Sequence, residues 1–136
     1  MKLAINIANP YVAASQNTLP IDQLSWLIFH EDARVRLQLA ENPKLPVAYL
    51  ADLANDEHPE VRIAVAEHPH TPISIVELLA EDNHVDVRHA IAENANMPVH
   101  ILHILANDEN PYVSARAYVT LKRLEGEFVT TLRCCA

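Results

Sequence analysis

Glycine is the residue that this sequence most lacks, because Gly126 is the only one in 136 residues. Tight hairpin turns depend on glycine and on other residues that tolerate a left-handed backbone, so the chain has few places for β-hairpins. Aromatic residues make up only 5% of the chain, whereas 50% of it is apolar. With many alanines and leucines and so little glycine, the composition favours helices, and we predict an all-α fold.

Cysteine is nearly absent as well, with only Cys134 and Cys135 side by side near the end. Neighbouring cysteines rarely bridge because the bond strains the peptide between them, which excludes a disulfide framework. Reduced thiols fit a reducing compartment, and we expect the protein to be cytoplasmic. The first residues have one positive charge and then Asn6 and Asn9 in the apolar run, which makes a poor signal peptide, and no stretch approaches a membrane span.

Basic residues are few, since ten Lys and Arg stand against eighteen Asp and Glu for a net charge of −8. Binding to nucleic acid depends on clustered cations that meet the phosphate backbone, so this balance argues against a nucleic-acid partner. The excess of negative charge also makes copies of the protein repel one another, and we therefore favour a monomer.

The chain has a strong internal repeat, in which the same residue types return at 26-residue steps. The apolar and proline columns are Pro20, Pro46, Pro72 and Pro98, then Leu27, Leu53, Leu79 and Leu105, then Val35, Val61, Val87 and Val113. Such self-similarity is typical of a solenoid, in which each unit buries its apolar face against neighbouring units. We therefore predict an α-solenoid, or superhelix, of short helix pairs, whose function lies on its surface.

One repeat domain with irregular ends accounts for the whole length. The predicted divisions are an N-terminal partial repeat at 1–19, repeats at 20–45, 46–71, 72–97 and 98–123, and a C-terminal tail at 124–136. In the last part, residues 112–125 form one longer predicted helix that Gly126 ends, and residues 128–136 have no predicted structure.

The segment 72–97 illustrates the helix pair expected in each repeat. Apolar residues at spacings of three and four predict a first helix with Pro72 in its first turn and Thr71 as its N-cap. A second helix follows with Asp86 as its N-cap, and Asn94 is the expected left-handed stop. Because connectors leave roughly 18 residues for both helices, a 3₁₀ helix is an alternative for one member of each pair.

Two stretches carry a resemblance to a known family. Residues 61–72 have the sequence VRIAVAEHPHTP, and residues 87–94 have the sequence VRHAIAEN. They resemble the leucine-rich repeat variant family, whose units combine V-R, V-A-x-N-P and T-P with L-L and L-A-x-D. The resemblance covers residues 33–117 well and implies a right-handed solenoid of alternating α and 3₁₀ helices, related to HEAT-like and armadillo-like arrays. It implies little about activity.

The founding member of that family carries a cysteine-bound iron–sulfur cluster ahead of its repeats. No cysteine precedes Cys134 in this sequence, so we carry over the fold alone and expect no cofactor. The sequence also has no nucleophile with a base at motif spacing, no glycine-rich phosphate loop and no Cys-x-x-Cys motif, and we expect no enzyme activity.

Charged and polar columns run through the repeats beside the apolar ones. The acids are Asp56, Asp82 and Asp108, and the bases are Arg36, Arg62 and Arg88. An acid that recurs near a base most simply forms a ladder of charge-assisted hydrogen bonds along the stack. The column of His58 and His84 is expected to cap turns, and His68, which alternates with Asn42 and Asn94, is also expected to be structural.

Metal binding is the alternative function, because the chain has eight histidines. His100 and His103 lie three residues apart on one predicted helix, and Glu77 occupies the place of His103 one repeat earlier. Two histidines and a carboxylate are a ligand set for zinc. A solvated polar face explains the same residues more simply, and we predict no metal site.

Candidate partner-binding residues come from columns with large or acidic side chains. On the first helix of each repeat these columns are Trp26, Asp52, Leu78 and Ile104, and Gln23, Tyr49, Ile75 and Ile101. Trp26 and Tyr49 are aromatic anchors if the columns face solvent, but short helices need a wide apolar face, which favours packing in the core. Glu41, Glu67 and Glu93 form an acidic row suited to a basic partner. We predict an interaction module whose partner is a protein or peptide.

Overall fold

The computed structural model of the protein describes residues 8–16 and 19–134, with side chains up to residue 126. Within these ranges the chain contains only α-helices, which confirms the all-α prediction. The helices are α1 (Pro10–Ala14), α2 (Ile21–Leu27), α3 (Ala33–Ala40), α4 (Val47–Leu53), α5 (Pro59–Glu67), α6 (Ile73–Ala80), α7 (Val85–Glu93), α8 (Val99–Leu105) and α9 (Pro111–Cys134). Among the described residues, none of these helices has the length and apolar character that crossing a membrane requires.

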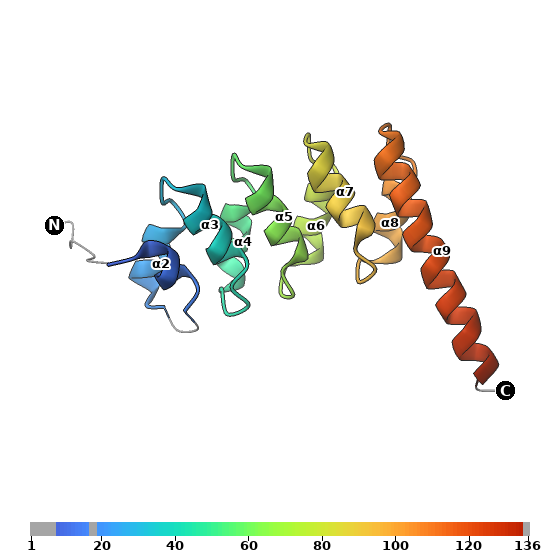
Figure 1. Ribbon diagram of the computed structural model, residues 1–136, viewed down its shortest axis with the longest axis horizontal. Coiled ribbons are helices and arrows are strands. Elements are labelled where there is room, and N and C mark those ends of the chain that lie inside the picture. Colours follow the sequence, from blue (N-terminus) through green and yellow to red (C-terminus); the bar gives the residue numbers. More distant parts are fainter. Residues whose placement is uncertain (1–7, 17–18, 135–136) are drawn as a thin grey trace. The chain divides into compact units, whose positions relative to one another are not determined.

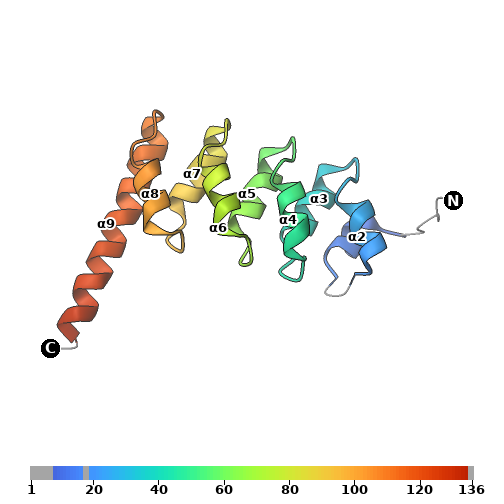
Figure 2. The same cartoon turned by 180° about the vertical axis from the view of Figure 1, so that it is seen from behind.

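The chain divides into two compact units, one ending at Ile75 and the other beginning at Val76. In the first unit, α3 packs against α1 and α5, and α2 and α4 pack behind this layer (Figure 1). The opposite view brings α2 and α4 to the front (Figure 2). In the second unit, α9 packs against both α7 and α8. Of the predicted partial repeat at 1–19, residues 1–7 and 17–18 lie outside the described residues.

The recurring apolar residues of the sequence form the core of each unit. All members of the two columns are buried, namely Leu27, Leu53, Leu79 and Leu105 with Val35, Val61, Val87 and Val113. Fully burying one such side chain contributes about 1.5–3 kcal/mol. Helices of seven to nine residues, such as α4 and α5, are too short to be stable in isolation, so this burial holds them in place.

The even-numbered helices begin one residue later than predicted. Proline is itself the N-cap of α2, α4 and α8, and it offers no side-chain hydrogen bond there. The prediction that Thr71 caps the next helix is wrong, because α6 begins at Ile73 and the Thr71 hydroxyl donates to the Val65 carbonyl at 2.6 Å. The last carbonyls of α5 have no partner within their own helix, so they attract this hydroxyl.

The odd-numbered helix α7 also differs from the prediction at both ends. Its N-cap is His84, whose Nδ1 accepts a hydrogen bond from the Asp86 N–H at 3.3 Å, so Asp86 lies in the first turn instead. Asn94 is extended, with φ −79° and ψ 109°, and no residue in the described ranges other than glycine has a positive φ. Its Oδ1 accepts from the Asn96 N–H at 2.9 Å, which closes the turn without a left-handed residue.

The 3₁₀ alternative for one helix of each pair is not used in the part of the chain that the structure describes. Both members of each pair are α-helices there. The proline N-caps and the side-chain caps shorten the connectors, which leaves enough residues for two α-helical turns in each member.

The last helix is longer than predicted. It extends over 24 residues, and Gly126 lies inside it. A methyl group at Gly126 would meet nothing within 4 Å, and its φ is not positive, so no close packing or special conformation requires glycine there. The prediction that Gly126 ends the helix is wrong, because glycine inside a helix costs only about 1 kcal/mol and the residues before it, LKRLE at 121–125, are strong helix formers. The backbone of the predicted tail is therefore helical to Cys134, and residues 135–136 lie outside the described residues.

In each unit, a buried arginine–aspartate pair ties the turn between an even-numbered helix and the next odd-numbered helix to the odd-numbered helix before both of them. Arg36 donates from Nε to Asp56 Oδ2 at 2.6 Å and from Nη2 to Asp56 Oδ1 at 3.0 Å, with side chains only 8% and 5% exposed. Arg88 and Asp108 repeat this contact in the second unit at 2.7 and 3.1 Å. In both pairs, Nη1 of the arginine donates to a carbonyl six residues earlier, at 2.6 and 2.7 Å. One arginine–aspartate pair of the predicted ladder is therefore present within each unit.

These contacts keep the two aspartates ionised. Burial of Asp56 opposes its ionisation, but hydrogen bonds from Arg36 and the His58 N–H outweigh that cost, and the pKa of Asp56 lies below its ordinary value. The hydrogen bond from Arg88 is the main cause of a lowered pKa at Asp108. Each carboxylate also accepts from the backbone N–H two residues later, at 2.9 and 2.8 Å, so it fixes the start of the next helix.

A second ladder of buried side chains joins successive loops. Asn42 Nδ2 donates to the Gln16 carbonyl at 2.8 Å, and His68 Nε2 contacts the Asn42 carbonyl at 2.9 Å, each reaching 26 residues back. The His70 N–H donates to His68 Nδ1, so Nδ1 lacks a proton and Nε2 carries it. In the second unit, the buried Thr120 hydroxyl donates to a carbonyl of α7 at 2.7 Å. This column is structural, as predicted.

We expect Asp56→Asn to lower the free energy of unfolding by about 3 kcal/mol at pH 7, because the buried Arg36 guanidinium then has only the exposed carboxylate of Glu57, 3.5 Å away, as a counter-charge. Since the folded-state pKa of Asp56 is lowered, its contribution is complete above about pH 4 and is lost as the pH falls through the folded pKa. Urea unfolding at pH 7 and pH 3 should therefore show a difference from wild type that narrows in acid.

Asp32→Asn is the matched control for this substitution. Asp32 also binds an arginine, Arg34, but that guanidinium is exposed, so the loss of stability should be much smaller than for Asp56→Asn. Equal losses for the two variants would contradict the role given to burial.

We expect His68→Asn to retain most of the stability and His68→Ala to lose about 2 kcal/mol. Asparagine makes the equivalent hydrogen bonds at position 42. Alanine removes the contact with the buried Asn42 carbonyl, which keeps only its bond from the Leu45 N–H, and it leaves the part-buried His70 N–H without its acceptor. Thermal unfolding of the two variants measures the difference. If both lose the same amount, ring packing rather than hydrogen bonding explains the histidine.

We expect Gly126→Ala to stabilise the protein by about 1 kcal/mol and to raise the melting temperature by about 4 °C, because alanine is the better helix former and fits without a clash. Circular dichroism at 222 nm during heating measures both helicity and melting. Ala115→Gly, at an exposed position of the same helix, should have the opposite effect of similar size. No change in the first variant would argue against a helix continuing through residue 126.

Candidate functional site

The odd-numbered helices of the first unit leave a groove of about 430 Å³ between α3 and α5, which we call the α3–α5 groove. Its floor consists of Leu37, Ala40, Ile63 and Ala64. Ala40 and Ala64 are buried and small, so they leave room above them, while Leu37 and Ile63 remain partly exposed. The groove therefore offers apolar surface that the fold itself does not cover.

Three glutamates surround this floor. Glu41 follows the last residue of α3, Glu60 lies in the first turn of α5, and Glu67 is the last residue of α5. All three are exposed, and none forms an ion pair or side-chain hydrogen bond with another described residue. The arrangement concentrates negative charge beside an apolar surface.

The structure thus brings two of the predicted partner-binding glutamates, Glu41 and Glu67, to one groove. The sequence analysis missed Glu60, because its column contains Arg34, Asp86 and Tyr112 and shows no common charge. The sequence does place Glu60 in the first turn of a predicted helix. A carboxylate stabilises a helix there whether or not it binds a partner, so this position does not indicate a binding site.

The third predicted glutamate, Glu93, lies in the second unit and has an internal partner. Its Oε1 lies 3.7 Å from Nη1 of Arg116 on α9, and both side chains are about half exposed, at 59% and 42%. The position 52 residues before Arg116 is Ala64, in the floor of the α3–α5 groove. A guanidinium therefore meets the glutamate in the second unit, whereas alanine stands at the equivalent place in the first.

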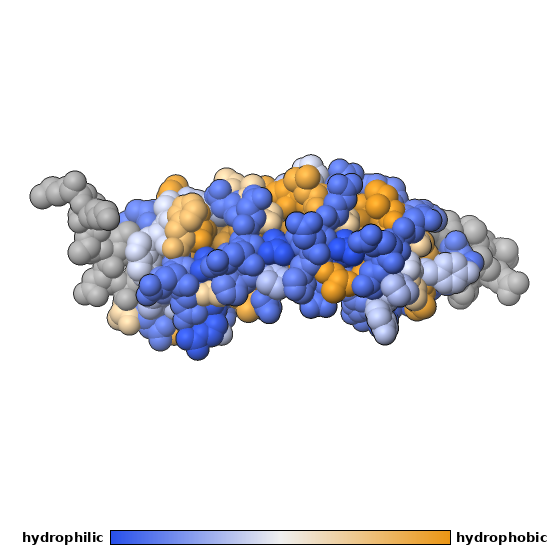
Figure 3. Space-filling model, turned by 90° about the horizontal axis from the view of Figure 1, so that it is seen from above, coloured by the Kyte–Doolittle hydropathy of each residue, from blue (hydrophilic) through white to orange (hydrophobic). Residues whose placement is uncertain are grey.

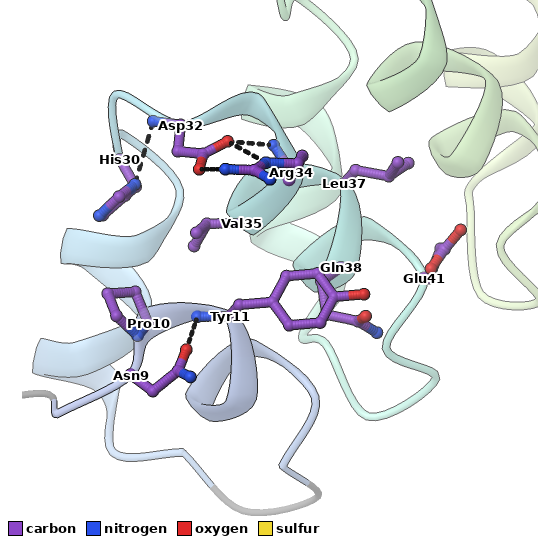
Figure 4. Close-up of a pocket in the computed structure, with 10 residues that line it drawn as sticks. All are labelled: Asn9, Pro10, Tyr11, His30, Asp32, Arg34, Val35, Leu37, Gln38 and Glu41. Carbon is purple, nitrogen blue, oxygen red and sulfur yellow. Dashed lines mark hydrogen bonds and ion pairs between the residues drawn. The ribbon is translucent and has the colours of Figure 1, made fainter.

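A second groove, of about 510 Å³, lies between α1 and α3 (Figure 4). Tyr11, which is 50% exposed, projects into it from α1, and Leu37 and Glu41 line it together with the α3–α5 groove. Arg34 folds back onto Asp32, with Nη2 and Oδ2 2.8 Å apart, and these hydrogen bonds lower the pKa of Asp32 to about 2. The cation at this groove is therefore already paired within the chain.

The aromatic candidates lie on the other layer of the first unit. Trp26, on α2, is 39% exposed, and its ring meets His30 edge-on with ring centroids 4.8 Å apart. Tyr49, on α4, is partly exposed, and its hydroxyl lies 3.4 Å from the Ser25 Oγ. Neither residue lines the two grooves, so the five predicted partner-binding residues do not share one surface.

The expectation that these columns pack in the core is wrong for the Trp26 column. Leu78 and Ile104, its members in the second unit, are 72% and 51% exposed. Each short helix already buries a stripe on one side, such as Leu24 and Leu27 in α2, and this column points away from that stripe. In the other column Ile101 is fully buried, whereas its remaining members are partly exposed.

Exposed apolar side chains are scattered over the face that Figure 3 shows. They reach the surface as patches separated by hydrophilic residues. Isolated exposed apolar residues are usual on protein surfaces, so the grooves are the more specific features.

The metal candidates form a pair and not a ligand cluster. His100 Nε2 lies 3.0 Å from Glu77 Oε1, and both side chains are about half exposed. His103 is exposed on the same helix as His100. Among the described residues, no three His, Cys, Asp or Glu side chains are placed to hold one metal ion.

Comparison with known proteins gives a family match for part of the chain. No curated protein and no solved structure matches it significantly. The sequence model described as Leucine rich repeat variant matches residues 59–84, which contain α5 and α6. This family consists of HEAT-like helical repeats. Residues 59–84 are therefore a repeat of the leucine rich repeat variant family.

Proposed function

We propose that this protein is a non-catalytic interaction module that binds a protein or peptide on the surface of its helices. The observation that carries the proposal is the α3–α5 groove, an open apolar floor between carboxylates without internal partners. The matched family supports it, because its helical repeats are typically non-catalytic and suggest protein interaction.

The proposal includes the architecture of the whole chain. We infer a right-handed α-solenoid with a 26-residue repeat, in which 20–45, 46–71, 72–97 and 98–123 are the repeats, 1–19 is a partial repeat and 124–136 is the tail. The equivalent geometry of the Arg36–Asp56 and Arg88–Asp108 pairs supports this division. The handedness comes from the family resemblance.

The two polar ladders suit such a module because they fix the helices before a partner binds. The Asp56 carboxylate accepts from a backbone N–H of its own turn, and the Asn42 side chain donates to a carbonyl of the loop before it. A surface that is ordered in advance loses less conformational entropy on binding, which improves affinity for a given contact area. The ladders therefore contribute to binding without contacting the partner.

We expect a selection from a library of random 12-residue peptides, with the folded protein immobilised, to enrich sequences that then bind it in solution. Isothermal titration measures this binding, and an unrelated acidic protein of similar net charge is the control. Trp26→Ala and Glu41→Gln then show which surface is used, and loss of a central anchor should weaken binding at least about tenfold. A library that yields only peptides binding the control equally well would refute an interaction module.

A further inference from the structure

We infer that the α3–α5 groove binds a basic segment of a partner protein, with an apolar side chain on its floor and lysine or arginine side chains at its glutamates. This inference rests on the proposed function and specifies the chemistry of the partner. The apolar floor favours binding of an apolar side chain of the partner. The glutamates beside the floor favour partners in which basic residues flank that side chain.

The floor of the groove fits an apolar anchor. Ala40 and Ala64 are 0% and 8% exposed, whereas Leu37 and Ile63 keep part of their surface accessible to water. The groove is open to solvent and has a volume of about 430 Å³, so a side chain can enter it from the surface. An aliphatic side chain placed there would cover the remaining apolar surface of the floor, which is favourable because apolar surface leaves water.

The charges around the floor select a cationic partner. Glu41, Glu60 and Glu67 line the groove together, and no lysine or arginine lines it with them. Carboxylates beside a surface of low dielectric raise the local concentration of cations and repel anions. Phosphate backbones and anionic membrane surfaces are therefore disfavoured, and a second copy of a chain with net charge −8 is disfavoured overall.

The second unit contains an internal example of the proposed contact. There Arg116 approaches Glu93 from the neighbouring helix α9, and the corresponding positions in the first unit are Ala64 and Glu41. The fold thus places an arginine against this glutamate column where the chain supplies one. Among the described residues none lies in this place in the α3–α5 groove, and we assign it to the partner.

The neighbouring α1–α3 groove extends the surface available to the segment. Leu37 and Glu41 line both grooves, so a bound chain can continue from one into the other. Tyr11 then offers the face of an exposed ring to a further lysine or arginine.

The test uses three fluorescein-labelled peptides of 12 residues and fluorescence anisotropy. The first peptide contains lysines and leucines, the second replaces each lysine by glutamate, and the third replaces each leucine by serine. We expect measurable binding of the first peptide alone, with an affinity that falls as the salt concentration rises. The proposal is overturned if the three peptides bind equally well or if the first does not bind.

Glutamine variants locate the binding. The combined variant E41Q, E60Q and E67Q should bind the lysine–leucine peptide about tenfold more weakly, because three exposed ion pairs are lost. Glu93→Gln is the matched control, since Arg116 already occupies that carboxylate, and it should bind like wild type. Equal affinities of the triple variant and wild type would overturn the assignment, and so would an equal loss in the control.

An occluding variant tests the same groove from its floor. Ala64→Arg places a guanidinium where Arg116 stands in the second unit, and it should weaken the lysine–leucine peptide about tenfold by filling the groove and pairing with Glu41. Thermal unfolding verifies that each variant is folded. If Ala64→Arg does not fold, the glutamine variants still decide whether the peptide binds in the α3–α5 groove. Analytical ultracentrifugation tests whether the protein associates with itself. If the wild type self-associates and the triple glutamine variant does not, a second copy of the chain binds in the groove, and the proposal is overturned.

These outcomes separate the partner chemistry from the proposed function. The random library samples every surface, including the one around Trp26, whereas the designed peptides test only the chemistry of the α3–α5 groove. Enriched peptides without basic residues would leave an interaction module in place and overturn the basic partner.

Discussion

The bidentate contact between Arg36 and Asp56, with its counterpart in the second unit, is the interaction on which the rest of the structure depends. In each pair, the arginine lies on a helix and the aspartate lies in a turn 20 residues later. Both side chains are largely buried. Such burial is costly unless every polar atom is satisfied, and here the remaining N–H and carboxylate oxygens bind backbone groups. The turn therefore has one low-energy arrangement, and it sets where the following helix begins.

Short helices make this constraint necessary. A helix such as α4 has seven residues and cannot persist without tertiary contacts. The apolar columns supply the burial, but they do not by themselves fix the rotation of one helix against the next. The hydrogen bonds of Arg36 and Asn42 add such a constraint, because they join α3 and the loop after it to defined backbone and side-chain groups.

The sequence predicted the parts of the fold that depend on repetition. The burial of the leucine and valine columns and the recurrence of an arginine–aspartate pair in each unit agree with what the spacing predicted. The residues at which the helices begin and end could not be predicted from the spacing. Asn94 and Gly126 are residue types that often end helices. A local hydrogen bond closes the turn at Asn94 without a left-handed residue, and strong helix formers precede Gly126, so the helix continues through it. Glu60 was not predicted, because the residues at 26-residue steps from it share no charge. It lines the same groove as Glu41 because α3 packs beside α5.

The ladder of Asn42 and His68 has a direction. Each side chain hydrogen-bonds to a carbonyl of the loop before it, so the acceptor always precedes its donor in the chain. Removing residues from the amino-terminal side leaves a buried donor such as Asn42 Nδ2 without a partner, whereas trimming from the other side leaves carbonyls that water can reach. During synthesis on the ribosome, each new segment meets an acceptor that has already been made, so folding can proceed in the order of translation.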